Sequence, residues 1–124
     1  MPVFLFAENG FDMFELIAQG KQPEHRWRRQ LPTNTPVDIG RHTPWSIPWD
    51  AKVSRRHLTV ELKGSLLVVK RLPESSNPVF YKGKDLNSFG IRANEHFVVG
   101  NTTFSLSNAR AFVTQDVPNP IRQK

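Results

Sequence analysis

The chain of 124 residues has no cysteine, and this absence excludes several kinds of chemistry at once. Disulfides, thiolate zinc sites, iron–sulfur clusters and cysteine nucleophiles all require a thiol. Long apolar runs are missing too: the run near the start, residues 3–7, is too short to span a membrane and lacks the basic flank of a signal peptide. We therefore expect a cytoplasmic protein with no membrane span.

Acidic residues are scarce after position 25. Residues 1–25 hold four acids and one base, a net charge of −3, whereas residues 26–124 hold seven acids and sixteen bases, a net charge of +9. Such a basic body attracts an anionic partner, which by charge alone is nucleic acid, an acidic lipid surface or a phosphorylated peptide. The interleaved aromatic and basic residues typical of an RNA-binding sheet face are not visible, so nucleic acid is the less favoured partner.

Helical periodicity is also rare, and ten prolines and seven glycines favour turns. Short alternating segments bounded by turn residues predict strands instead. We predict strands over residues 14–18, 27–31, 37–39, 58–63, 66–72, 79–81, 97–99 and 103–106. The first segment also fits one face of a helix, but the strand is favoured because a short loop would join it to the second segment as a hairpin. Many short strands at even spacing are typical of an antiparallel β-sandwich.

The predicted strands place one domain over residues 14–107, which suits the chain length and a hydrophobic content of 38%. Residues 1–13 are interpreted as an N-terminal extension without further assignment. Residues 108–124 are expected to be a C-terminal strand or linker, and Pro118 and Pro120 place the linker in residues 115–124.

Polar residues suited to a phosphate ester stand at the ends of predicted strands. Three such segments are 40–41 (Gly-Arg), 54–57 (Ser-Arg-Arg-His) and 76–77 (Ser-Asn). Loops at one end of a sandwich cluster, so the three segments can share one apical pocket. Arginine offers a planar fork for bidentate phosphate bonds, and serine and asparagine add neutral donors. A nucleotide-binding loop is not indicated, because no glycine-rich loop leads into a helix.

The order and spacing of these segments resemble a forkhead-associated (FHA) domain. Arg41 precedes Ser54 by thirteen residues, and His57 precedes Asn77 by twenty. The similarity extends over residues 14–107, through the strand that leads into Gly40 and the closing hairpin at 94–106. The resemblance implies an all-β sandwich of about eleven strands with little or no helix. It also implies a module that binds phosphothreonine peptides through its apical loops and is not an enzyme.

The resemblance also implies roles for five ligand-binding residues. Arg41 and Ser54 would bond the phosphate, and Arg55 would add a charged contact. Asn77 would bond the peptide backbone beside the phosphothreonine, with Ser76 next to it.

Two further residues of the pattern are implied to be structural. His57 would brace the loop that presents Ser54, and Gly40 would allow a close approach of two strands. His57 has no carboxylate or second histidine at ligand spacing, so we expect no metal, no cofactor and no catalytic role for it.

The sequence departs from the FHA pattern in the turn after Asn77. Pro78 replaces the usual glycine and biases Asn77 toward extended backbone, which would misplace its side chain. Lys82 replaces a second asparagine and is expected to add charge near the pocket. Trp45 and Trp49 lie in a proline-rich loop. They would either cover one edge of the core or bind an apolar side chain of a peptide, and the role in the core is favoured.

We therefore expect a phosphothreonine-dependent peptide-binding module of a signalling protein, fused to a further signalling module. Its partner would be a threonine-phosphorylated protein or peptide. Two alternatives stay open: a degenerate FHA-like scaffold that binds proteins without phosphate, favoured by Pro78, and a basic binder of nucleic acid or acidic lipid, favoured by the charge. An enzyme is least supported, because no acid–base pair or partnered nucleophile is visible.

Overall fold

The computed structural model describes residues 10–112, in which the chain forms eleven strands and no helix. This part of the chain accordingly has no helix long and apolar enough to cross a bilayer. The prediction of an all-β fold with about eleven strands is confirmed.

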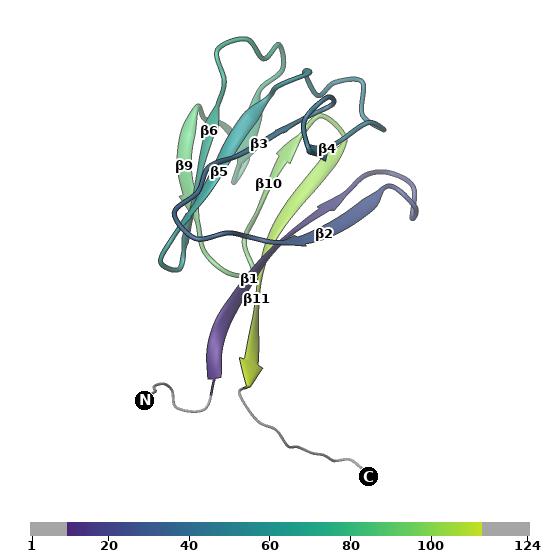
Figure 1. Ribbon diagram of the computed structural model, residues 1–124. Helices are drawn as coiled ribbons and strands as arrows, with labels where there is room; N and C mark the ends of the chain where they lie inside the picture. The colour runs from purple at the N-terminus through teal and green to yellow at the C-terminus, as the bar shows by residue number, and fades with distance from the viewer. Residues whose placement is uncertain (1–9, 113–124) are drawn as a thin grey trace.

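The strands form two sheets that face each other (Figure 1). The six-stranded sheet has the order β2 (Arg26–Gln30), β1 (Gly10–Gln19), β11 (Thr102–Phe112), β10 (His96–Val99), β7 (Val79–Tyr81) and β8 (Lys84–Asp85). The five-stranded sheet has the order β4 (Trp45–Ser46), β3 (Val37–Gly40), β5 (Leu58–Lys63), β6 (Leu66–Arg71) and β9 (Ser88–Ile91). All neighbours are antiparallel except β3 and β4, so the predicted antiparallel sandwich is confirmed.

Residues 14–18, whose apolar pattern fits either a strand or a helix face, belong to the strand β1. β1 pairs with β11 along its whole length, from Gly10 opposite Phe112 to Gln19 opposite Thr103, and its second half also pairs with β2 as the predicted hairpin. The sheet therefore begins four residues before the predicted limit of 14 and ends five residues after the predicted limit of 107. The rest of the expected N-terminal extension, and the expected linker at 115–124, lie outside the described residues.

Three strands are absent from the sequence prediction, two because of their length and the third because of a glycine. β4 and β8 have two residues each, too few for any alternation, and β4 lies in the proline-rich loop. β9 carries Gly90 in its middle, where a Cβ would lie 2.9 Å from the Leu66 side chain on the neighbouring strand. Tertiary packing rather than local pattern decides these three strands.

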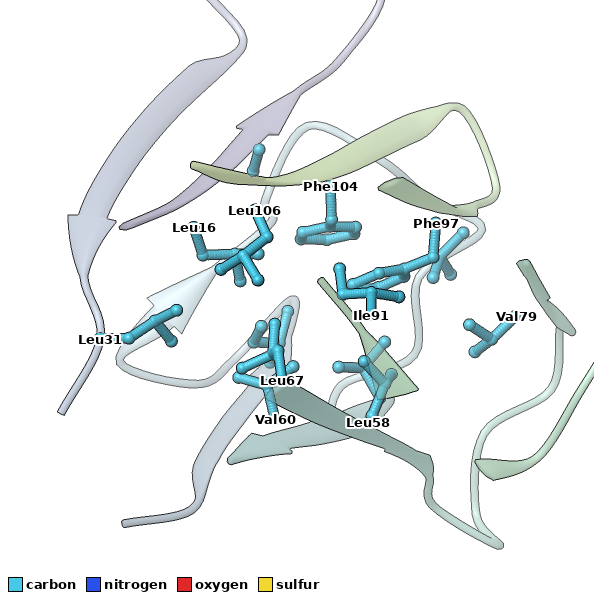
Figure 2. Packing of buried hydrophobic residues seen from close by; sticks show 14 of the residues in the cluster. Leu16, Leu31, Leu58, Val60, Leu67, Val79, Ile91, Phe97, Phe104 and Leu106 are labelled. Atoms are coloured by element: carbon cyan, nitrogen blue, oxygen red, sulfur yellow. The ribbon is translucent and has the colours of Figure 1, made fainter. Parts of the chain in front are cut away.

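The core lies between the two sheets, as Figure 2 shows. Alternate residues of β5 are buried, as the sequence pattern predicts for a half-buried strand. Phe97 and Phe104 stack with ring centroids 4.9 Å apart and are both fully buried. The aliphatic side chains that pack with them include Leu16, Leu58, Val60, Leu67, Ile91 and Leu106.

The loops that carry the predicted site meet at one end of the sandwich. Contacts join the segment before β5 to the loop before β7, and the same segment to the β10–β11 turn. In Figure 1 this end is at the top, whereas β1 begins and β11 ends at the bottom. The core thus holds the loops in a fixed relation at the end remote from Gly10 and Phe112.

The β7–β8 hairpin gives a test of the backbone geometry. Lys82 and Gly83 both have positive φ, 52° and 77°, as a two-residue hairpin turn requires. A Cβ at Gly83 would meet nothing within 4 Å, so Gly83→Ala should destabilise the fold through backbone strain alone, by about 1–2 kcal/mol. Urea unfolding measures this loss, and Lys84→Ala in the same hairpin is the control. Equal stability of both variants would contradict the turn assignment.

Candidate functional site

The pairing of β3 with β5 places Arg41 and Ser54 on neighbouring segments of the chain. The Arg41 backbone N–H donates to the Ser54 carbonyl at 3.0 Å, and the His57 backbone N–H donates to the Ile39 carbonyl at 2.9 Å. The pairing thus continues past the end of both strands, so two of the three predicted segments lie side by side.

At Gly40 these two segments lie too close together to leave room for a side chain. A Cβ at this position would lie 2.2 Å from the Arg55 carbonyl oxygen and 2.8 Å from that of Ser54. Real Cβ atoms do not approach backbone oxygens so closely, hence any other residue would push the two chains apart. The glycine therefore sets how near Arg41 lies to the Ser54 loop.

His57 connects the second and third segments from inside the protein. Its side chain is fully buried; Nδ1 accepts the Ser54 backbone N–H at 2.9 Å, and Nε2 lies 2.8 Å from the Asn77 carbonyl oxygen. Because a carbonyl only accepts and a backbone N–H only donates, these partners assign the neutral tautomer with the proton on Nε2. Burial lowers the pKa of His57 below its usual value, which agrees with a neutral ring.

Two more hydrogen bonds tie the same loops together. The Ser76 backbone N–H donates to the Ser54 hydroxyl oxygen at 3.0 Å, and the Asn77 side-chain amide donates to the Lys52 carbonyl at 2.9 Å. Asn77 therefore lies within the loop cluster although Pro78 follows it. The structure brings all three predicted segments into one cluster of loops.

Several hydrogen-bonding groups in this cluster have no partner within residues 10–112. The Arg41 Nε donates to the Val53 carbonyl at 2.6 Å, but its two terminal nitrogens make no hydrogen bond or ion pair there. The Ser54 hydroxyl accepts one bond and has its own proton left to donate. The Arg55 side chain is exposed and has no carboxylate partner in the same range. These donors are available to an anion.

Arg56 differs from its neighbour Arg55. Its guanidinium contacts two carboxylates, Asp38 at 3.1 Å and Glu74 at 3.0 Å. These ion pairs are exposed, so each contributes little to stability, but together they hold the side chain beside β3. Of these two neighbouring arginines, Arg56 is therefore already paired, whereas Arg55 has no carboxylate partner among residues 10–112.

Lys82 does not lie near the loop cluster, so the expectation that it adds charge there is wrong. It follows the end of β7 that is remote from Asn77, and its Nζ lies 3.9 Å from Glu95 and over the Tyr81 ring. Its physical role there is in the β7–β8 turn, where it has the positive φ described above.

Asp50 is a residue of this region that sequence reasoning did not identify. Its carboxylate is 3% exposed and accepts the Lys52 N–H at 3.1 Å, the Asn101 N–H at 2.8 Å and the Thr102 hydroxyl at 2.8 Å. It thereby fixes the segment before Ser54 to the β10–β11 turn. No local pattern marks it, because two of its three partners, Asn101 and Thr102, lie 51 and 52 residues later in the chain.

The two tryptophans of the proline-rich loop pack against the core, as the favoured interpretation expects. Trp45 meets Trp27 edge-on at 5.7 Å, and Trp49 stacks on His25 at 5.5 Å. Among residues 10–112 there is also no group of three His, Asp or Glu side chains that could hold a metal ion.

Comparisons with known proteins identify the fold. No known family and no curated protein matches the chain, whereas 41 solved chains are similar to it. The Slr1951 protein from Synechocystis sp. is 23% identical, with 82% of this chain and 100% of that chain covered and a TM-score of 0.69. The FHA domain of the CT664 protein from Chlamydia trachomatis is 19% identical, with 77% and 96% covered and a TM-score of 0.66.

A third similar structure contains a ligand. Mycobacterium tuberculosis EmbR in complex with a low-affinity phosphopeptide is 20% identical, with 75% of this chain and 24% of that chain covered and a TM-score of 0.59. The chain therefore has the fold of FHA domains, in agreement with the sequence resemblance.

His57→Ala should destabilise the domain. The substitution leaves the part-buried Ser54 N–H and Asn77 carbonyl without their His57 partner, at a total cost of about 1–3 kcal/mol. Thermal unfolding measures the loss, with His42→Ala as a control on an exposed histidine. An unchanged melting temperature would contradict the bridging role.

Acidification should weaken the fold through the same residue. Burial lowers the pKa of folded His57, whereas the unfolded ring has its usual value near 6.5, so the unfolded state binds a proton first as pH falls. The stabilisation is complete above that pH and is lost as pH falls toward the folded pKa. Urea unfolding from about pH 7 to about pH 5 should show a steeper loss of stability than in His57→Gln. Identical pH profiles would refute the linkage.

Proposed function

We propose that this chain is a module that binds a threonine-phosphorylated segment of a partner protein through Arg41, Ser54, Arg55, Ser76 and Asn77. The observation that carries the proposal is the set of Arg41 and Ser54 donors that have no partner within residues 10–112 and are held together by the Gly40 contact and the His57 bridge. The FHA fold supports it, as does the complex of EmbR with a phosphopeptide, in which 24% of the EmbR chain is similar to this chain.

Arg41 is suited to neutralise the phosphate. Its Nε bond to the Val53 carbonyl fixes the plane of the guanidinium and leaves the two terminal nitrogens for the ligand. A phosphothreonine carries nearly two negative charges at neutral pH and three acceptor oxygens. Charge-assisted bonds between such groups are about twice as strong as neutral ones.

Ser54 supplies a neutral donor beside the charge. Because its oxygen already accepts the Ser76 N–H, the hydroxyl proton points to another acceptor, and a phosphate oxygen fills that role. Arg55, next in sequence, has an exposed side chain with no carboxylate partner among residues 10–112, and it adds long-range attraction. The Ser76 side chain is exposed at the rim and adds a second hydroxyl.

Asn77 has two tasks in this proposal. Its amide nitrogen braces the loop through the Lys52 carbonyl, so the side-chain oxygen is the atom left for the ligand. That oxygen can accept a backbone N–H of the peptide beside the phosphothreonine. Pro78 is compatible with this role, since Asn77 already lies in the cluster.

The proposed module binds without turnover and recruits a partner for other domains. No acid–base pair is found among the loop residues described above. A binding domain of this kind acts by bringing a phosphorylated protein to the other domains of its own polypeptide. We therefore place it in a cytoplasmic signalling protein with a further module. The FHA resemblance also implies phosphothreonine over phosphoserine.

Arg41→Ala should weaken phosphopeptide binding by about 2–5 kcal/mol, because the phosphate is left partly desolvated without its counter-charge. At about 1.4 kcal/mol per decade this is at least a tenfold loss. Isothermal titration with a peptide selected from a phosphothreonine library measures it. Arg92→Ala is the matched control, since it removes an exposed arginine at the other end of the sandwich.

The phosphoserine and unmodified versions of the same peptide complete the test. They should bind more weakly than the phosphothreonine form, the unmodified peptide most of all. Equal binding of phosphorylated and unmodified peptide would favour a phosphate-independent scaffold. Full affinity in Arg41→Ala would reject Arg41 as the phosphate ligand.

A further inference from the structure

The second feature of the molecule that suits a partner is the free edge of β2. Within residues 10–112 this strand pairs with β1 alone, and it forms one border of the six-stranded sheet (Figure 1). It lies on a different part of the molecule from the Ser54–Asn77 cluster, and nothing in the proposed function uses it.

The hydrogen-bond register shows which backbone groups of β2 face outward. Leu31 donates to the Phe14 carbonyl and Gly20 donates to the His25 carbonyl, so these are hydrogen-bonded pairs of the antiparallel ladder. Such pairs alternate with pairs whose backbone groups point away from each other. The register therefore turns the N–H and C=O groups of Arg28 and Gln30 away from β1.

The side chains of this edge are strongly basic. Arg26, Arg28 and Arg29 are all exposed. Arg28 is paired with Glu15, and Arg26 bonds the neutral Gln19 side chain.

Arg29 is the most distinctive of the three. Its guanidinium lies over the rings of Trp27 and Trp45, 5.6 Å and 5.9 Å from their centroids, and it has no carboxylate partner among the described residues. Trp27 in turn donates to the Ser46 carbonyl at 2.8 Å, which joins β2 to the edge of the other sheet. Among the described residues, the edge is therefore tied to the other sheet and carries a positive charge that no carboxylate neutralises.

Charge decides which strand this edge accepts. Two copies of β2 placed edge to edge would bring arginines opposite arginines, which is destabilising. Positive side chains on an edge strand likewise deter neutral or basic strands. An acidic strand, in contrast, would be attracted by these arginines. It would also form hydrogen bonds with the backbone groups of β2 that face away from β1.

We propose that the β2 edge is a second protein-binding surface, which takes an acidic, extended segment of a partner as an added strand. The backbone groups of Arg28 and Gln30 supply the hydrogen bonds of strand addition. Arg26 and Arg29 supply the preference for acidic side chains. This surface acts independently of the phosphate-binding loops.

The test uses a capped peptide of alternating glutamate and threonine residues, twice the length of β2, and its lysine–threonine counterpart. The acidic peptide should bind with a saturable isotherm and the basic one should not bind. The amide protons of Arg28 and Gln30 should become slower to exchange in the complex, because they enter hydrogen bonds.

Two variants separate charge from backbone. The Arg26→Glu, Arg29→Glu double variant should bind the acidic peptide at least about tenfold more weakly, whereas Lys63→Glu, Lys70→Glu on the other sheet, with the same change in charge, should not. Gln30→Pro removes one outward N–H without altering charge, and edge strands tolerate proline at such positions. It should weaken binding, whereas Gln30→Ala should not.

Several results would overturn the proposal. Binding without protection of the Arg28 and Gln30 amides would mean contact by charge alone. Tighter binding of a duplex DNA oligonucleotide that competes with the peptide would assign the edge to nucleic acid. Self-association abolished by the double variant would assign it to a second copy. The double variant should keep its affinity for the phosphothreonine peptide. A negative result for the β2 edge would therefore leave the proposal for the phosphate-binding loops standing, and the reverse also holds.

Discussion

The buried His57 imidazole is the contact on which the apical end of this protein depends. One ring nitrogen accepts from the Ser54 backbone and the other donates to the Asn77 carbonyl, so a single neutral side chain sets the distance between two loops. Because both partners are backbone groups, the ring fixes the course of the chain and leaves the side chains of both residues for other bonds. The same ring is fully buried, so both loops are bonded to a side chain inside the sandwich.

Asp50 is the second buried polar residue that holds the Ser54 loop. His57 bonds this loop to the Asn77 loop, and Asp50 bonds it to a different neighbour. Its three hydrogen bonds join that loop to the β10–β11 turn, and Gly100 leaves the space it occupies, since a Cβ there would lie 2.9 Å from the carboxylate. Both residues are polar, buried and hydrogen-bonded, as most buried polar groups in proteins are. The loop is therefore held from two sides, while the terminal nitrogens of Arg41 and the Ser54 hydroxyl proton have no partner within residues 10–112.

The parts of the structure that the sequence predicts are those with a local cause. The alternation of β5 and the glycine between β10 and β11 specify strands and turns within a few residues. The resemblance to FHA domains adds the site segments, which the fold brings together. The two-residue strands and Asp50 have distant causes, and so does the difference between Arg55 and Arg56, because Asp38 and Glu74 each lie eighteen residues from Arg56. Lys82 is a different case, because the predicted strand 79–81 already lies between it and Asn77 and so separates it from the loop cluster.

The long β1–β11 pair also determines how the domain responds to mechanical load. Gly10 and Phe112 are opposite each other at the same end, so tension applied between them opens the ladder one pair at a time. Strands loaded in this way resist far less than strands pulled lengthwise past each other, where all the bonds break together. The apical loops lie at the far end of that ladder, so partial peeling leaves their geometry intact until the pairs near Gln19 separate.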